Sequence, residues 1–455
     1  MLLRWLLPMV ERWVRGVGDL AMVAERYPQA AYAGFAHSFQ AEYQYVCRCV
    51  PGAEEHLAPL EDAIRNVFIP ALLAIPAEEV TDDFRRLLAQ SVKGGGLNIR
   101  DPVASAPRLL QSSREATAVL VQSLAERSAL DGMEHKQCVR DAGRRARKEC
   151  MAEEAAFVGE LKEKASKAVA KRLERIGEAG AWLTVLPNKL DGTLLSAEEW
   201  GDNARLRYGL RPIGLCDHCD GCGAGLTVEH ALSCKKGGLV SIRHDDVRDE
   251  VGALAVLATT NSKVSFEPLI FYGKNIAAGI GAGKQAQSAK SKTAQGKKTR
   301  KANVPGDEAR GDVAVHGLWK RGQTCVLDVR ITDTDAKSYA SASSEKVLER
   351  AAKQKKDKYL NACLERRRSF TPLVYSVDGL ACKEARAFER RIAGLLATKW
   401  DRRYSEMAGF VRARMSLAIV RSNTMLLRGS RIGRAARLVV DDGARFDAMQ
   451  ERRGW

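Results

Sequence analysis

The chain has 455 residues, more than one hydrophobic core usually holds, so several structural units are expected. Hydrophobic residues make up 45% of it, which excludes a protein that is disordered throughout. Lys and Arg number 73 against 56 Asp and Glu, and the formal charge of +17 favours a polyanionic partner, either nucleic acid or an acidic membrane surface.

The N-terminal segment MLLRWLLPMVERW is apolar, but Arg4 and Pro8 interrupt it and Glu11 and Arg12 follow. We therefore expect an amphipathic first helix, not a secretory signal. No run approaches the ~18–20 apolar residues that a membrane span needs, so no membrane partner is predicted. The 11 cysteines are odd in number and mostly isolated, which indicates a reducing compartment.

Residues 1–130 show apolar spacing of three and four, which predicts helices. The segment 131–204 reads as a charged helical connector. Its long helix, over 134–178, is a solvated helix in the simplest interpretation and a nucleic-acid-facing helix in the second. Within 182–200 we expect a short strand or turn and then a capped helix. Breaks in the first region are expected at Pro28, Pro51, Pro59, Pro70 and Pro76.

The segment CDHCDGCGAGLTVEHALSC has the spacing of a metal-binding knuckle. Cys219 and Cys222 form a Cys-x2-Cys pair, and His230 and Cys234 lie one helical turn apart. Four such ligands leave no open position, so the pattern predicts structural zinc. Cys216 is an alternative to Cys219, and the spacing does not decide between them.

After the knuckle we expect a helix over 242–258 and a strand over 263–273. Residues 274–304 carry many Lys and Arg and no acid, which predicts a flexible basic loop. Such a loop is either simply solvated or touches phosphates. The residues expected to contact nucleic acid are Lys297, Lys298, Arg300 and Lys301.

Short apolar runs over 312–315 and 324–331 predict a β-hairpin with carboxylates on it. Asp312 opens the first strand, and Asp328 and Arg330 point to one face of the second because side chains alternate along a strand. Carboxylates in such a layout can hold Mg²⁺ or Mn²⁺, and a nearby cation can stabilise a phosphate. The alternative interpretation is an ordinary hairpin with a surface salt bridge.

A helix is expected over 343–366, followed by a strand over 371–377 and further helix over 383–428. Leu348, Ala351, Lys355 and Tyr359 recur at helical spacing, so this stripe should face the sheet. Lys355 would then lie on the buried face, where it needs a carboxylate partner.

With these segments in view, the chain resembles the C-terminal part of non-LTR-type retrotransposon reverse transcriptases that carry a restriction-like endonuclease. The resemblance rests on YPQAAYAGFAHSF and LEDAIRNVFIPALL for a thumb-like region, and on GGGLNIRDP and LRYGLRP for a connector. The knuckle segments CDGCG and VEHALSCKKGGLV also match. So do EARGDVAVHGLW, VLDVRI, KQKKDKY and SFTPLVYSVDG, which resemble the nuclease core.

The resemblance implies a nuclease in which Asp312 and Asp328 bind Mg²⁺ and the catalytic lysine is Lys355 or Lys356. Arg330 stands where nucleases of this kind often have lysine. A further acid is implied, and its candidates are Asp249, Glu250 and Glu267.

The implied function is DNA nicking that primes reverse transcription by the complete element. The alternative is a catalytically inactive nucleic-acid-binding remnant, which Arg330 favours. The implied partners are DNA and element RNA, and also the full-length reverse transcriptase or a second copy of this chain. Nuclear action is expected from the substrate, and cytoplasmic residence otherwise. No Asp-Asp pair has the aromatic hairpin context of a polymerase, so this chain alone is not expected to polymerise.

The expected fold class is therefore α+β with several domains. A mainly α-helical N-terminal half precedes a small zinc knuckle and a C-terminal α/β core of the restriction-endonuclease type with a short mixed sheet. The expected units are 1–130 (helical, thumb-like), 131–204 (connector), 205–240 (knuckle), 241–430 (nuclease-like core with the 274–304 insert) and 431–455 (tail).

Overall fold

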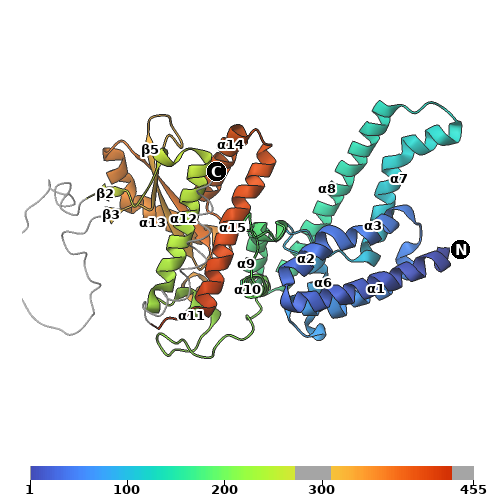
Figure 1. Ribbon diagram of the computed structural model, residues 1–455, viewed down its shortest axis with the longest axis horizontal. Coiled ribbons are helices and arrows are strands. Elements are labelled where there is room, and N and C mark those ends of the chain that lie inside the picture. The colour runs from blue at the N-terminus through green and yellow to red at the C-terminus, as the bar shows by residue number, and fades with distance from the viewer. Residues whose placement is uncertain (1, 272–308, 433–455) are drawn as a thin grey trace, which may run out of the picture.

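The computed structural model describes residues 2–271 and 309–432, which form mostly helices and a small mixed sheet (Figure 1). This confirms the predicted mainly helical α+β composition. The predicted basic loop with Lys297, Lys298, Arg300 and Lys301, and the tail from residue 433, lie outside the described residues. None of the described helices is long and apolar enough to cross a membrane. The unit boundaries stay predictions.

The N-terminal helices pack around one apolar core in which Trp13, Phe35 and Phe68 are almost fully buried. Pro70 was expected to interrupt the helix, but it lies inside a continuous helical run from Ala58 to Leu73. A wider π-helical segment, Ile64–Phe68, precedes it. The helices are α1 (Leu2–Arg26), α2 (Pro28–Gly34), α3 (Gln40–Cys49), α4 (Ala58–Ala63), α5 (Ile69–Leu73) and α6 (Asp82–Ala89).

Helices α7 (Pro102–Glu126) and α8 (Gly132–Lys164) pair as a long hairpin that projects from this body (Figure 1). The expectation of one helix over 134–178 was wrong. The chain leaves helical geometry at Ala165, and the Ser166 side chain accepts a hydrogen bond from Val169 N to start α9 (Lys167–Ile176). A Ser N-cap competes with helix continuation, which explains the break.

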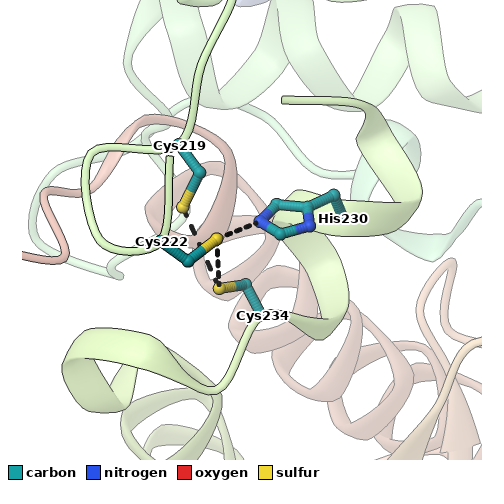
Figure 2. Close-up of side chains that lie close together, drawn as sticks. All are labelled: Cys219, Cys222, His230 and Cys234. Carbon is teal, nitrogen blue, oxygen red and sulfur yellow. Dashed lines mark hydrogen bonds between the residues drawn. The ribbon is translucent and has the colours of Figure 1, made fainter. Parts of the chain in front are cut away.

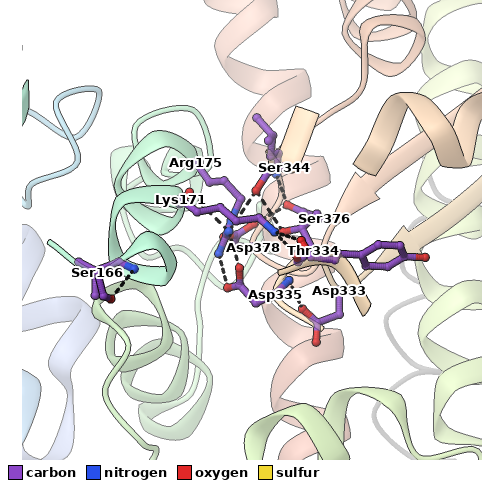
Figure 3. A network of polar contacts seen from close by, with 12 residues as sticks. Ser166, Lys171, Arg175, Asp333, Thr334, Asp335, Ser344, Ser376 and Asp378 are labelled. Atoms are coloured by element: carbon purple, nitrogen blue, oxygen red, sulfur yellow. Dashed lines mark hydrogen bonds and ion pairs between the residues drawn. The ribbon is translucent and has the colours of Figure 1, made fainter. Parts of the chain in front are cut away.

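Helix α9 joins the helical body to the sheet region through a buried polar network (Figure 3). The Arg175 guanidinium, 3% exposed, donates to Asp335 Oδ2 at 2.6 Å and to Asp378 Oδ2 at 2.6 Å. The Lys171 ammonium donates to the carbonyls of Thr334 and Tyr339. The charged connector therefore ends in a packed contact at the C-terminal ends of two strands.

The helix predicted after residue 196 is α10 (Ala197–Tyr208), and its capping box between Ser196 and Glu199 is present. The preceding segment is a short 3-10 turn (Ala181–Thr184), so the strand alternative does not form. Trp182 and Trp200 meet edge to face and pack into the N-terminal core. The predicted helix after the knuckle is α12 (Leu239–Ala258).

The sheet has the strand order β1-β4-β5-β6. Its β1, β4 and β5 are antiparallel, whereas β5 and β6 are parallel, with Asp328 opposite Pro372. The single strand expected over 263–273 divides at Glu267, whose φ is 50°, and its second half pairs in a separate small sheet. The strands are β1 (Val264–Phe266), β2 (Leu269–Phe271), β3 (Ala309–Arg310), β4 (Val313–His316), β5 (Thr324–Thr332) and β6 (Ser369–Ser376).

Helix α13 (Ser344–Glu365) lies on one face of the sheet, where Tyr359 and Cys363 pack against Val326 and Phe370. The other face, with Leu327 and Val329, packs against α12 and α14 (Lys383–Trp400), and α15 (Tyr404–Arg428) packs on these two helices. The helix expected over 383–428 is thus two helices, because Asp401 adopts a left-handed φ of 50° and ends α14.

Candidate metal centres

The predicted knuckle brings four ligand atoms together in one place (Figure 2). The sulfur atoms of Cys219, Cys222 and Cys234 and a ring nitrogen of His230 all lie within 4.8 Å of one another. Cys219 Sγ lies 3.9 Å from Cys234 Sγ, and Cys234 Sγ lies 4.0 Å from Cys222 Sγ. Tetrahedral zinc with bonds of ~2.3 Å separates two sulfurs by about 3.8 Å, so the geometry fits such an ion.

Local backbone structure explains this arrangement. Cys219 N donates to Ala224 O, and Gly223 N donates to Cys219 O, with Gly223 in the left-handed region at φ 73°. This tight turn returns the chain so that Cys222 lies beside Cys219. On the other side, Cys234 N donates to His230 O, as expected for residues one helical turn apart. The helix α11 (Val228–Ser233) carries His230 and starts at the Thr227 cap.

The structure decides the ligand that spacing left open. Cys219 belongs to the cluster, whereas Cys216 is exposed and outside it. Burial opposes ionisation of Cys219, but hydrogen bonding from His230 and from the backbone of Gly221 and Cys222 lowers its thiol pKa to about 6. The cluster therefore favours a thiolate at neutral pH, which is the form that binds metal.

The knuckle is fastened to the end of α15. Asp220 Oδ2 accepts hydrogen bonds from Ser430 Oγ and Arg431 N, each at 2.8 Å. The buried Arg431 guanidinium donates to Ala231 O at 3.0 Å. These contacts hold the cysteine turn against the C-terminal end of α15.

The second candidate site, the carboxylate centre, consists of Asp312, Asp328, Lys355 and His244. Val313, the first residue of β4, pairs with Leu327 of β5. Asp312 comes just before Val313 and Asp328 just after Leu327 in this antiparallel pair, so the two aspartates lie opposite each other. Asp312 Oδ2 accepts from Val329 N and lies 3.2 Å from His244 Nε2. The site is thus assembled from α12, the start of β4, β5 and α13.

Lys355 reaches this centre from α13, as the apolar stripe predicted. Its ammonium lies 2.6 Å from Asp328 Oδ2, while Lys353 and Lys358 are exposed. The Oδ2 atom is buried, and the Lys355 ammonium is its charged partner. Burial raises the pKa of Asp328, and the nearby Lys355 charge opposes that rise. A buried carboxylate needs such a partner, and Lys355 supplies it here.

The other predicted cations lie elsewhere. Lys356 is paired with Glu384 at the start of α14, away from Asp328. Arg330 shares a face of β5 with Asp328, as expected, and donates to Gln354 Oε1 at 2.9 Å. Of the two lysines considered, only Lys355 is in contact with a carboxylate of the centre.

The three acids considered for a further ligand have other partners. Glu250 is paired with Arg414 of α15 at 2.7 Å. Asp249 and Glu267 both pair with Arg248, at 2.9 and 3.2 Å. Glu267 is joined to Asp312 only through the backbone, its N donating to Asp312 O at 2.9 Å.

His244 was not singled out from the sequence. It lies on α12, and hydrogen bonding to Asp312 raises the pKa of its imidazole. The signal available in advance was its position in the segment RHDD, one position before the Asp-Asp pair, on a helix that packs on the sheet.

The Asp-Asp pairs do not form a polymerase site within the described residues. Asp82 and Asp83 begin α6, and Asp245 and Asp246 lie on α12, so neither pair is on a β-turn. The pair at Asp441 and Asp442 lies outside the described residues.

The chain matches no protein-family model and no curated protein sequence. What the two centres can do therefore follows from their own geometry and chemistry.

Proposed function

We propose that this chain is a retroelement-derived DNA-binding module that nicks DNA with Mg²⁺ or Mn²⁺ and contains a structural zinc. The observation that carries the proposal is the carboxylate centre, in which Asp312 and Asp328 lie on adjacent strands and Lys355 approaches Asp328 at 2.6 Å. Two carboxylates at one edge of a sheet and a lysine from the helix packed on it are the groups that metal-dependent phosphodiester cleavage needs.

In this proposal Asp312 and Asp328 would hold the divalent ion, which polarises a phosphate oxygen and activates water when bound. Lys355 neutralises charge that develops on the phosphate, because its ammonium already lies beside Asp328. Arg330, on the same face of β5, can orient a neighbouring phosphate with its planar guanidinium. His244 holds Asp312 in place through the contact at Oδ2.

The Cys219–Cys234 cluster would bind zinc as a structural ion, because its four ligands close the coordination sphere. Such a site stabilises a loop-rich segment by about 10–16 kcal/mol. It would hold the segment between α10 and α12 in the shape that packs on α15. The proposed partners are DNA and element RNA, and the proposed place of action is the nucleus.

A second candidate function is a nucleic-acid-binding remnant without nuclease activity. Two observations favour it: Arg330 replaces the expected lysine, and the three considered acids are engaged with Arg248 or Arg414. In that case the basic surfaces and the knuckle would persist while the carboxylate centre only stabilises the fold.

Nicking of supercoiled plasmid by the purified full chain separates these functions. Metal-dependent conversion to open circle, absent in both Asp312→Ala and Asp328→Ala, is the expected result. DNA affinity of Asp312→Ala should equal or exceed that of the parent, because a negative charge is lost. Cutting by Asp312→Ala at the parental rate would contradict the metal assignment. Retained DNA binding without any nicking would establish the remnant.

A further inference from the structure

Helix α8 of the projecting hairpin is mostly exposed. The face of α8 that is turned away from α7, called its outward face, packs against no other described element. Only Ala142 and Phe157 of its 33 residues are buried. The hairpin stands away from the helical body, with α7 covering one side of α8 (Figure 1). The composition of the opposite side is therefore not dictated by a core.

That opposite side is basic. With 100° per residue, the side facing away from Ala142 carries Lys136, Arg140, Arg144, Arg147 and Lys148. The stripe runs from Lys136 to Lys148, twelve steps along the helix, so it is about 18 Å long at 1.5 Å per step. This length corresponds to roughly five base pairs of duplex DNA at 3.4 Å per step.

The acids of α8 lie beside this stripe or behind it and are partly used in other contacts. Asp141 pairs with Arg144. Glu153 pairs with Arg108 of α7, and Glu154 accepts hydrogen bonds from Ser91. Between Lys136 and Lys148, the side opposite Ala142 therefore carries bases and no acid, and Asp141 lies at its edge.

Four cations of the stripe remain without a counter-charge. All four are exposed and form no ion pair with any residue that the structure describes. Like charges spaced by four along a helix destabilise it by a few tenths of a kcal/mol per pair, and this stripe has three consecutive pairs of that kind. A polyanion would relieve this repulsion along its whole length. The four residues are Lys136, Arg140, Arg147 and Lys148.

We propose that the outward face of α8 binds the phosphodiester backbone of nucleic acid and is a contact surface separate from the carboxylate centre. The identity of the polymer rests on the proposed function, whereas the charge pattern stands on the structure alone. Because cations on a straight stripe recognise phosphates and not base edges, binding here is independent of sequence. Duplex DNA and structured RNA both supply this backbone.

The test neutralises the four unpaired cations as Gln in the full-length protein and measures the salt dependence of affinity. Binding is measured on the Asp312→Ala background without divalent metal, so loss of nicking cannot alter the readout. The probes are duplex DNA, single-stranded DNA and an RNA hairpin. The slope of log affinity against log salt should become shallower by about 3 to 4 on duplex DNA. When the salt concentration rises from about 0.05 to 0.2 M, the affinity of the neutralised variant for duplex DNA should therefore fall roughly 100-fold less than that of the parent.

A matched control removes four exposed cations from other surfaces and should change the slope by less than about one. Equal changes in the two variants would overturn the proposal, because they would reflect only total charge. An effect confined to the RNA hairpin would support it and identify RNA as the source of the phosphates. Binding to vesicles of phosphatidylserine, with nucleic-acid affinity unchanged, would overturn it. The control residues are Arg26, Arg48, Lys383 and Arg402.

Folding is checked separately from binding. The variant Arg140→Lys with Arg147→Lys keeps both charges, so it should retain the parental salt slope. Helix content and metal content of the neutralised variant should match the parent, since the substituted side chains are exposed. If neutralisation unfolds the hairpin, the same measurement is made on Arg140→Gln with Arg147→Gln alone, for which the slope should change by about 2. No change in that variant would overturn the proposal.

Discussion

The knuckle cluster takes all of its ligands from one short segment, residues 219–234, whereas the carboxylate centre takes its groups from four elements that are far apart in the chain. The two sites also differ in their partners. In the knuckle the ligand atoms face one another, and their distances fit one ion. In the carboxylate centre each acid faces a basic side chain, His244 for Asp312 and Lys355 for Asp328. The closed local geometry fits a structural metal site, whereas the proposed nuclease site depends on contacts between elements that are distant in the chain.

The largest effect is expected from breaking the knuckle. Cys222→Ser should release the metal and unfold residues 205–245, because zinc of this type contributes on the order of 10–16 kcal/mol to folding. Metal content and amide hydrogen exchange of that segment measure the outcome. Cys216→Ser is the matched control and should keep the metal, since Cys216 is outside the cluster. A Cys222→Ser protein that stays folded and metal-free would show that the cluster needs no ion.

The next effect concerns the lysine of the carboxylate centre. Lys355→Met should reduce nicking about 10²- to 10³-fold, since it removes the cation beside the reacting phosphate. It should also lower the free energy of unfolding by about 1–3 kcal/mol, because Asp328 is left buried without its partner. Lys356→Met should change nicking less than about threefold and stability by less than about 1 kcal/mol. Equal losses in both variants would remove Lys355 from its proposed role.

The two sites should both lose function on acidification, although the pKa values of their key acids are shifted in opposite directions. The pKa of the Cys219 thiol is lowered to about 6, below the value of ~8.5 in the unfolded chain. The thiolate therefore contributes fully to the stability of the folded state above pH ~8.5, and this contribution is lost as the pH falls through about 6. The zinc content after dialysis should therefore decrease when the pH is below about 6.

Burial raises the pKa of Asp328, so this group needs a higher pH than an ordinary Asp to become a carboxylate. Mg²⁺-dependent nicking should rise with pH above the usual Asp range. A nicking rate that does not change with pH above the usual Asp range would contradict the proposed role of Asp328 as a metal ligand.

The smallest effect is expected at Arg330. Arg330→Lys keeps the charge but loses the planar contact to Gln354, so stability should change by less than about 0.5 kcal/mol. Nicking by the plasmid assay should change less than about tenfold if the parent is active. If the parent is a remnant, this substitution is the first one to try for recovery of activity. A large loss of stability would show that Arg330 is a structural residue.

Residue spacing along the chain was sufficient to predict a local arrangement where the interacting side chains are close in sequence. The Cys-x2-Cys and His-x3-Cys pairs, the Ser196 cap and the α13 stripe all depend on turns or helical periodicity within a few residues. Each of them appears in the structure at its predicted position. Even there, spacing left Cys216 and Cys219 equivalent, and only the turn at Gly223 places Cys219 beside Cys222.

Contacts between distant elements decided the rest. The alternation of strand residues predicted the face of Asp328, but the pairing of Lys356 with Glu384, of Glu250 with Arg414 and of His244 with Asp312 depends on how α12, α14 and α15 pack. The sequence by itself therefore determined most of the helical and strand character, three of the four knuckle ligands and the charge pattern of α8. The tertiary structure alone decided which charged side chains meet, because partner choice among many Lys, Arg, Asp and Glu depends on three-dimensional distance and not on chain spacing.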